Sequence, residues 1–95
     1  MFVKLLILKS LEDVIAEIIA EDIDGKWYKI KNPFVTMVEE GNNRIIFYPY
    51  ISLSKDKEIK IPSDWVVTVV EPLDEVKNSY LEQVNGKSKN LNSEE

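Results

Sequence analysis

The chain contains no cysteine and no histidine, and each absence removes a class of chemistry. Without cysteine, no disulfide can staple the fold and no thiolate can act as nucleophile or metal ligand. Without histidine, the commonest general base and the commonest transition-metal ligand are missing. The sequence also lacks a glycine-rich phosphate loop, a serine elbow and a metal-ligand spacing. We therefore expect a protein that is not an enzyme and has no catalytic residues, no cofactor and no metal ion.

Long apolar runs and excess positive charge are missing as well. The apolar segment 2–8 is too short to span a bilayer, and no small-residue cleavage site follows it. These features predict a cytoplasmic protein with no membrane partner. The formal net charge of −5 counts against a general nucleic-acid coat, because such proteins draw on a basic surface, but it leaves room for a local basic site.

The residues that are present predict one small β domain. The chain has 95 residues, 44% of them hydrophobic, which suits a single domain with a modest core. Residues 14–22 are rich in Ala and Glu, which favour a helix, but they lack a 3.6-residue period and their β-branched residues favour a strand. The predicted strands are 2–9, 14–22, 26–38 with a bend at Pro33, 44–53 with a break at Pro49, 58–61 and 65–70.

The pattern changes to that of a helix after residue 71. Pro72 suits the first turn of a helix, and Asn85–Gly86 suits its end. The apolar stripe at helical spacing consists of Leu73, Val76, Tyr80, Leu81 and Val84. We expect a β domain over 1–71, a helix over 72–86 that packs on this domain or on a neighbouring subunit, and a disordered polar tail over 87–95.

The strand edges raise the question of assembly. Short loops between consecutive strands predict antiparallel pairing, and the most apolar candidate edges are the last strand, 65–70, and the fourth, 45–53. Exposed apolar edges aggregate unless they are covered, and a ring of identical subunits joined edge to edge leaves none free. The alternative is a monomeric barrel with the helix as its lid. The candidate interface residues are Ile45, Phe47, Val66, Thr68 and Val70.

Two segments, in this order, resemble the two motifs of the Sm-like family. Segment 6–18 has an apolar strand, a turn and a second strand on which Ala16 and Ile18 match the family pattern, and Asp22 follows at the spacing of the family's aspartate. Segment 59–69 is similar to the second motif, in which an apolar strand meets a tight turn and a short closing strand. Each motif is weak alone, and their order carries the resemblance.

Sm-like proteins encoded by bacteriophages resemble the chain more closely, over roughly residues 2–84. The shared features are Lys31–Asn32–Pro33, the cluster Phe47–Tyr48–Pro49–Tyr50, and Glu71–Pro72 before a helix. The resemblance implies an all-β fold, a small and strongly bent five-stranded antiparallel barrel with a C-terminal helix. It also implies a homomeric ring of about five to seven subunits, an RNA chaperone or other role in RNA metabolism, and the host cytoplasm as its location.

Three departures from the family pattern bear on RNA recognition. Leu11 replaces the turn glycine of the first motif. Lys26 falls near the position of the asparagine that contacts a base in RNA-binding members, and Pro62–Ser63 falls near that of an arginine–glycine pair. The usual uridine-binding set is therefore not reproduced, and the resemblance predicts fold and ring better than RNA specificity.

The resemblance places two turns on the pore of the ring, where a nucleotide pocket is possible. In that interpretation Lys26 pairs with a phosphate, Ser63 and Asp64 bond to a base edge, and a tryptophan stacks on a base. The same residues are also ordinary turn formers, with the tryptophans in the core or an interface. The candidate RNA-binding residues are Asp22, Asp24, Lys26, Trp27, Ser63 and Asp64, and Trp65 is a second stacking candidate.

A basic stripe is the second candidate for RNA contact. Strand alternation places Lys29 and Lys31 on one face with Trp27, and such a mixture of cations and an aromatic ring suits single-stranded nucleic acid. Lys9, Lys26 and Lys60 are further candidates for this stripe. A solvated strand face explains it equally well. Two hypotheses follow, a ring that binds single-stranded RNA and a structural or protein-interaction ring that does not.

Overall fold

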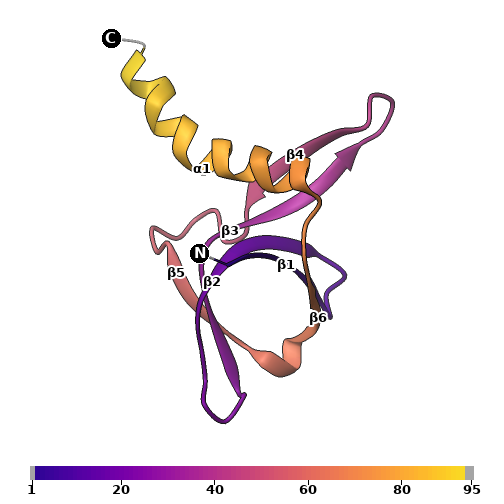
Figure 1. Ribbon diagram of the computed structural model, residues 1–95, viewed down its shortest axis with the longest axis vertical. Coiled ribbons are helices and arrows are strands. Elements are labelled where there is room, and N and C mark those ends of the chain that lie inside the picture. Colours follow the sequence, from indigo (N-terminus) through magenta and orange to yellow (C-terminus); the bar gives the residue numbers. More distant parts are fainter. Residues whose placement is uncertain (1, 94–95) are drawn as a thin grey trace.

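The computed structural model describes residues 2–93, with side chains up to residue 85 (Figure 1). One curled antiparallel sheet forms most of the molecule, and a single helix follows it. The elements are β1 (Val3–Leu8), β2 (Asp13–Glu21), β3 (Trp27–Glu39), β4 (Arg44–Pro49), β5 (Glu58–Pro62), the 3₁₀ turn η1 (Ser63–Trp65), β6 (Val66–Val70) and α1 (Asp74–Ser93). The predicted antiparallel, mostly β fold with one C-terminal helix is confirmed.

β3 is the central strand, because it pairs with three others. The hydrogen-bonded order of the sheet is β4-β3-β2-β1-β6, and β5 pairs with β3 beside this path. The first part of β3, residues 27–31, pairs with β5, and the later part, residues 34–39, pairs with β4. Between them lies Asn32, whose φ of 51° is in the left-handed region that asparagine tolerates better than most residues. The bend that we predicted at Pro33 therefore begins one residue earlier, at Asn32.

β2 is a strand and not a helix, as its β-branched residues predicted. Three consecutive residues, Val14, Ile15 and Ala16, are almost fully buried. Successive side chains of a strand point to opposite faces, so both faces of β2 must be covered at this point. A helix would instead bury one stripe with a longer period.

Two apolar cores lie on the two faces of the sheet. The inner core fills the concave face and consists of Leu6, Leu8, Val14, Ala16, Ile30 and Ile61. The outer core lies between the convex face and α1 and is built around Val3, Ile15 and Tyr80. The ring of Tyr80 meets that of Phe34 edge to face, with centroids 6.1 Å apart, and its hydroxyl donates to the Asn32 carbonyl at 2.9 Å. The helix therefore packs on its own sheet, directly at the bend of β3.

The helix differs from the prediction at both ends. Leu73 is 71% exposed and precedes the helix, since its carbonyl accepts the Lys77 N–H at 2.9 Å. It is therefore not part of the buried stripe, and Pro72 lies before the first turn. The predicted end at Gly86 is wrong, because α1 runs to Ser93. One glycine inside a helix costs only about 1 kcal/mol, so it need not end the helix.

Two strand predictions also need correction. β4 ends at Pro49, so residues 50–53 lie outside the strand that was predicted over 44–53. Tyr50 still continues the ladder, with its N–H donating to the Pro33 carbonyl at 3.0 Å, and residues 50–53 form a turn in which the Ser54 N–H donates to the Ile51 carbonyl at 3.2 Å. Trp65 belongs to η1 and not to the last strand. The predicted disordered tail includes residues 94–95, which lie outside the described residues.

β4 and β6 are the two ends of the sheet, as their apolar sequences predicted. Between residues 2 and 93, no strand pair joins β5 to β6. β6 exposes apolar side chains, with Val67 at 63% and Val70 at 41%. In the same part of the chain, no helix is long and apolar enough to cross a membrane.

Candidate functional site

The structure brings together the two turns that the sequence selected. The Ser63 N–H donates to the Lys26 carbonyl at 2.9 Å, and the Ser63 hydroxyl donates to the Gly25 carbonyl. The β2–β3 turn, residues 22–26, and η1 therefore form one continuous surface at one end of the sheet (Figure 1). We call this surface the turn cluster. Five of the six candidate RNA-binding residues lie in it, and Trp27 follows directly.

Two of these candidates use their side chains to hold the turns. The Asp22 carboxylate accepts the Lys26 N–H at 3.1 Å, and its backbone N–H donates to the Trp27 carbonyl at 3.0 Å. Asp22 therefore closes the β2–β3 turn, as aspartate does in many turns. The Ser63 hydroxyl is committed to Gly25 in the same way. Asp24, Lys26 and Asp64 are exposed, so their side chains are available to a ligand.

Trp65 lies on η1 and is 41% exposed. Its carbonyl accepts the Lys9 N–H at 2.9 Å, which ties η1 to the end of β1. Trp65 is the better placed of the two tryptophans for stacking on a base, because a cation already covers the Trp27 ring. Lys60 Nζ lies 4.4 Å from the centroid of that ring.

The predicted basic stripe assembles on the outer face of β3 and β5. Lys29 pairs in register with Lys60, whose Nζ lies over the ring of Trp27 at the start of β3. Lys29 also forms an ion pair with Glu58 at 3.6 Å, which offsets part of the positive charge. Sequence reasoning missed Glu58, because only the β3–β5 register brings it opposite the lysines. Lys9 lies elsewhere, beside η1, so the stripe is shorter than predicted. The outer basic face therefore consists of Trp27, Lys29, Lys31 and Lys60.

The candidate interface residues lie in different environments. The ring of Phe47 is 6.5 Å from that of Phe34 and belongs to the outer core under α1. Val66 packs against the inner core. Thr68 and Val70 are exposed on β6, and Ile45 is half-buried on β4. The strands that carry them are the sheet ends, although two of the side chains already pack inside the chain itself.

Leu11 was selected in the sequence only because it replaces the turn glycine of the first Sm-like motif. It lies in the β1–β2 turn with φ of 73°, a conformation rare for a leucine, and is 88% exposed. Within residues 2–93, no group of three acidic side chains is arranged to hold a metal ion.

The chain was matched to one family by its sequence. The matching family model is described as a family of unknown function, DUF6561, and it covers residues 1–85. The match covers all strands of the sheet, both turns of the turn cluster and the part of α1 that packs on the sheet. No curated protein matches the chain. The chain belongs to DUF6561, a family of unknown function.

Proposed function

We propose that this protein is an Sm-like subunit that assembles with copies of itself into a ring, and that the ring binds single-stranded RNA. The observation that carries the ring is that three strands have one unpaired side. Within residues 2–93, β6 pairs only with β1, and both β4 and β5 pair only with β3. Unpaired strand sides are templates for another chain, and head-to-tail pairing of two different sides generates a ring when the rotation closes.

The hydrogen bonds of β5 indicate which groups a neighbouring β6 would meet. The Asn32 N–H donates to the Lys57 carbonyl at 2.8 Å, and the Ser63 N–H donates to the Lys26 carbonyl. In an antiparallel pair such bonded positions recur at every second residue. The backbone groups of residues 57, 59, 61 and 63 therefore face β3, and those of residues 58, 60 and 62 face outward. Pro62 has no N–H to offer, which suits an edge position.

Two local features support the Sm-like assignment. Leu11 occupies the position of the family's turn glycine, and its φ of 73° is a conformation that glycine adopts without strain. The segment 59–69 forms an apolar strand, a tight 3₁₀ turn and a short closing strand, in the order of the second motif. In the proposed subunit the curled sheet is the barrel, and the inner core fills it.

RNA binding is supported by the position of the turn cluster beside the outer basic face. Exposed Lys26 would bind a phosphate, and Trp65 would stack on a base. A cation on one subunit is a weak contact, but a ring repeats it, and linked sites bind a strand more tightly than one site does.

The alternative is a ring that binds no nucleic acid. It is favoured by the committed side chains of Asp22 and Ser63, by the pairing of Lys29 with Glu58, and by the net charge of −5. This hypothesis keeps the ring and predicts a protein partner in place of RNA.

Native mass and salt-dependent RNA binding test the proposal in turn. A particle several times the protomer mass supports the ring, and a single protomer at high concentration contradicts it. Short oligouridine and oligoadenine are then titrated at several salt concentrations, because phosphate contacts make affinity fall with salt. We expect Lys26→Gln to weaken binding and lower the salt slope by about 1 per contacted phosphate. Lys55→Gln, at an exposed position outside the turn cluster, is the matched control. Absence of binding, or binding that salt does not weaken, favours the alternative.

A further inference from the structure

A hollow of about 580 Å³ opens on the concave face of the sheet, beside the inner core. It lies between the start of β1, the end of β2 and the end of β6. Its volume is in the range of about 300–1,000 Å³ found for small-molecule sites, which are mostly apolar with a few polar groups. Its lining residues are Phe2, Lys4, Ile18, Ile19, Ala20, Glu21, Tyr28 and Val69.

Lys4 is the unusual member of this lining. Strand alternation puts it on the same face as Leu6 and Leu8, which are completely buried in the inner core. Its own side chain is only 25% exposed. Lysine is rarely placed on a core-facing position unless its charge is paired. An apolar residue would serve the packing of β1 at least as well, so the fold alone does not account for Lys4.

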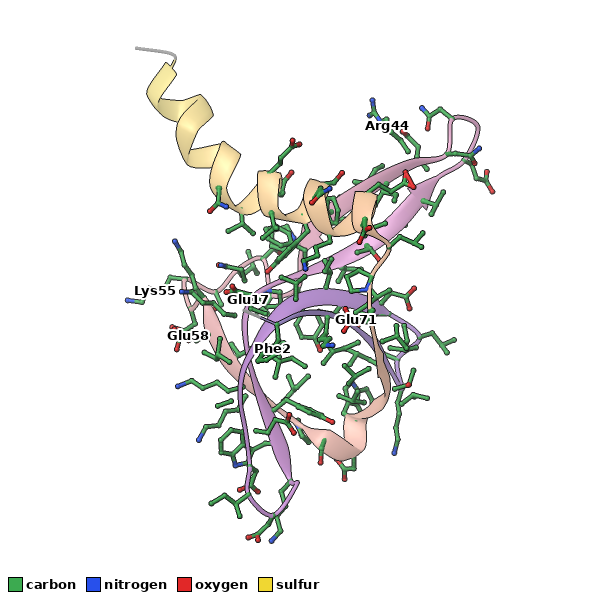
Figure 2. The ribbon with its side chains drawn as sticks, in the orientation of Figure 1. Phe2, Glu17, Arg44, Lys55, Glu58 and Glu71 are labelled. Carbon is green, nitrogen blue, oxygen red and sulfur yellow. The ribbon has the colours of Figure 1, made fainter. Side chains whose placement is uncertain are left out.

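Lys4 is paired with the carboxylate of Glu71, and this exposed side chain can move away from Lys4. Glu71 lies in the short connection between β6 and α1 (Figure 2). Its side chain accepts a hydrogen bond from Lys4. Hydrogen bonding to Lys4 lowers the pKa of Glu71, which favours the carboxylate form of that side chain. The Glu71 side chain is 72% exposed, so water can solvate it when it moves away. Lys4 would then offer its donors to another anion at the same point.

We infer that this hollow, the Lys4 pocket, binds a small amphipathic carboxylate. The apolar body of the ligand lies against Phe2, Ile18 and Val69, and its carboxylate replaces that of Glu71 on Lys4. The choice of an anion rests on charge, because Lys4 is the single cation among the lining residues. Glu21, the other charged residue of the lining, is exposed and is solvated without a ligand.

The pocket is formed within one chain and so does not depend on the ring or on RNA. Its lining comes from β1, β2, the start of β3 and β6, whereas the turn cluster and the outer basic face lie on other surfaces. A failure of RNA binding would leave this inference intact, and a failure of carboxylate binding would leave the ring intact.

Decanoate and decan-1-ol make a matched pair of probes for the pocket, because they differ mainly in the charge of the head group. Binding is followed by NMR through the methyl groups of Ile18, Ile19 and Val69, with those of Val38, on the β3–β4 hairpin, as a reference. We expect decanoate to bind more tightly than decan-1-ol, but by less than the roughly tenfold of an uncontested charge-assisted hydrogen bond, because Glu71 competes for Lys4. This comparison needs no variant and so does not depend on the folding of one.

Two variants then separate the head group from the body. Lys4→Met keeps the length of the side chain and should abolish the advantage of decanoate while leaving decan-1-ol binding unchanged. Glu71→Gln removes the competing charge and should tighten decanoate binding several-fold. Lys55→Met, at an exposed cation outside the pocket, should change neither. Equal binding of the two probes, no binding of either, or decanoate binding that Lys4→Met does not weaken would each overturn the inference.

Discussion

The contact between Tyr80 and the bend of β3 allows the most informative test of the fold. The Tyr80 side chain is 1% exposed, and its hydroxyl donates to the Asn32 carbonyl at 2.9 Å, with the Lys31 carbonyl 3.3 Å away. Removing the hydroxyl in Tyr80→Phe keeps the ring but leaves part-buried carbonyls without this donor. We expect a loss of about 1–2 kcal/mol of unfolding free energy. Tyr80→Ala also removes the ring from the outer core and should cost about 3–5 kcal/mol.

Thermal and urea unfolding of the two variants measure these losses. For a domain of this size, about 1 kcal/mol corresponds to a fall of roughly 4–8 °C in Tm. Tyr80→Phe should therefore lie clearly between the wild type and Tyr80→Ala. If Tyr80→Phe is as stable as the wild type, the hydroxyl of Tyr80 does not stabilise the contact between α1 and the bend of β3.

The pH dependence of the same variant provides an independent check. Burial raises the pKa of Tyr80 above its ordinary value of about 10. Between the unfolded and the folded pKa the folded state keeps a proton that the unfolded state has lost, so stability falls as the pH rises above about 10. Below that pH the phenol is neutral in both states and has no effect. This alkaline loss should be smaller in Tyr80→Phe, and an unchanged alkaline profile would contradict a buried phenol at this position.

The remaining predictions concern the turn at Leu11 and the outward side of β5. Leu11→Gly should raise the unfolding free energy or leave it unchanged. An L-residue at φ of 73° carries a strain of about 1–2 kcal/mol, which glycine relieves, but glycine also loses more backbone entropy on folding. A clear loss of stability in calorimetry would show that the exposed Leu11 side chain has a structural role. Lys60→Pro should give a folded protein of protomer mass in light scattering, because the backbone N–H that it removes faces away from β3. Ile59→Pro removes an N–H that faces β3, so a ladder hydrogen bond is lost and the unfolding free energy measured in urea should fall clearly. If Lys60→Pro keeps the mass of the wild-type particle, β5 is not the interface strand.

Local patterns predicted the strands well where one physical rule dominated. Alternation and β-branched residues were sufficient for β2, and Asp24–Gly25 marked the turn that follows it. The limits of β4 and α1 were wrong because they depend on long-range contacts. Residues 50–53 form a turn directly after the last pair of the β3–β4 ladder, and Leu73 is 71% exposed at the start of the helix. Single-residue preferences do not contain that information.

The candidate site was predictable in part for the same reason. Turn chemistry identified the two turns, and their contact through Ser63 follows from the pairing of β3 with β5. The ion pair of Lys29 with Glu58 could not be foreseen, because it depends on the register of β3 with β5, two strands that are not consecutive in the chain. Lys4 is the one charged residue of the apolar segment 2–8, and only the shape of the concave face relates it to a pocket.

The bend at Asn32 divides β3 into two parts that depend on different support. Ahead of it, the strand lies between β2 and β5 as part of the curl. Beyond it, the β3–β4 hairpin projects away from the curl and has α1 along one face (Figure 1). Truncating the chain before α1 should therefore free the hairpin first, and its amides should exchange with solvent faster than those of β1 and β2. Unfolding of the truncated protein would then begin at the β3–β4 hairpin and proceed to the curl, and hydrogen exchange would reveal this order.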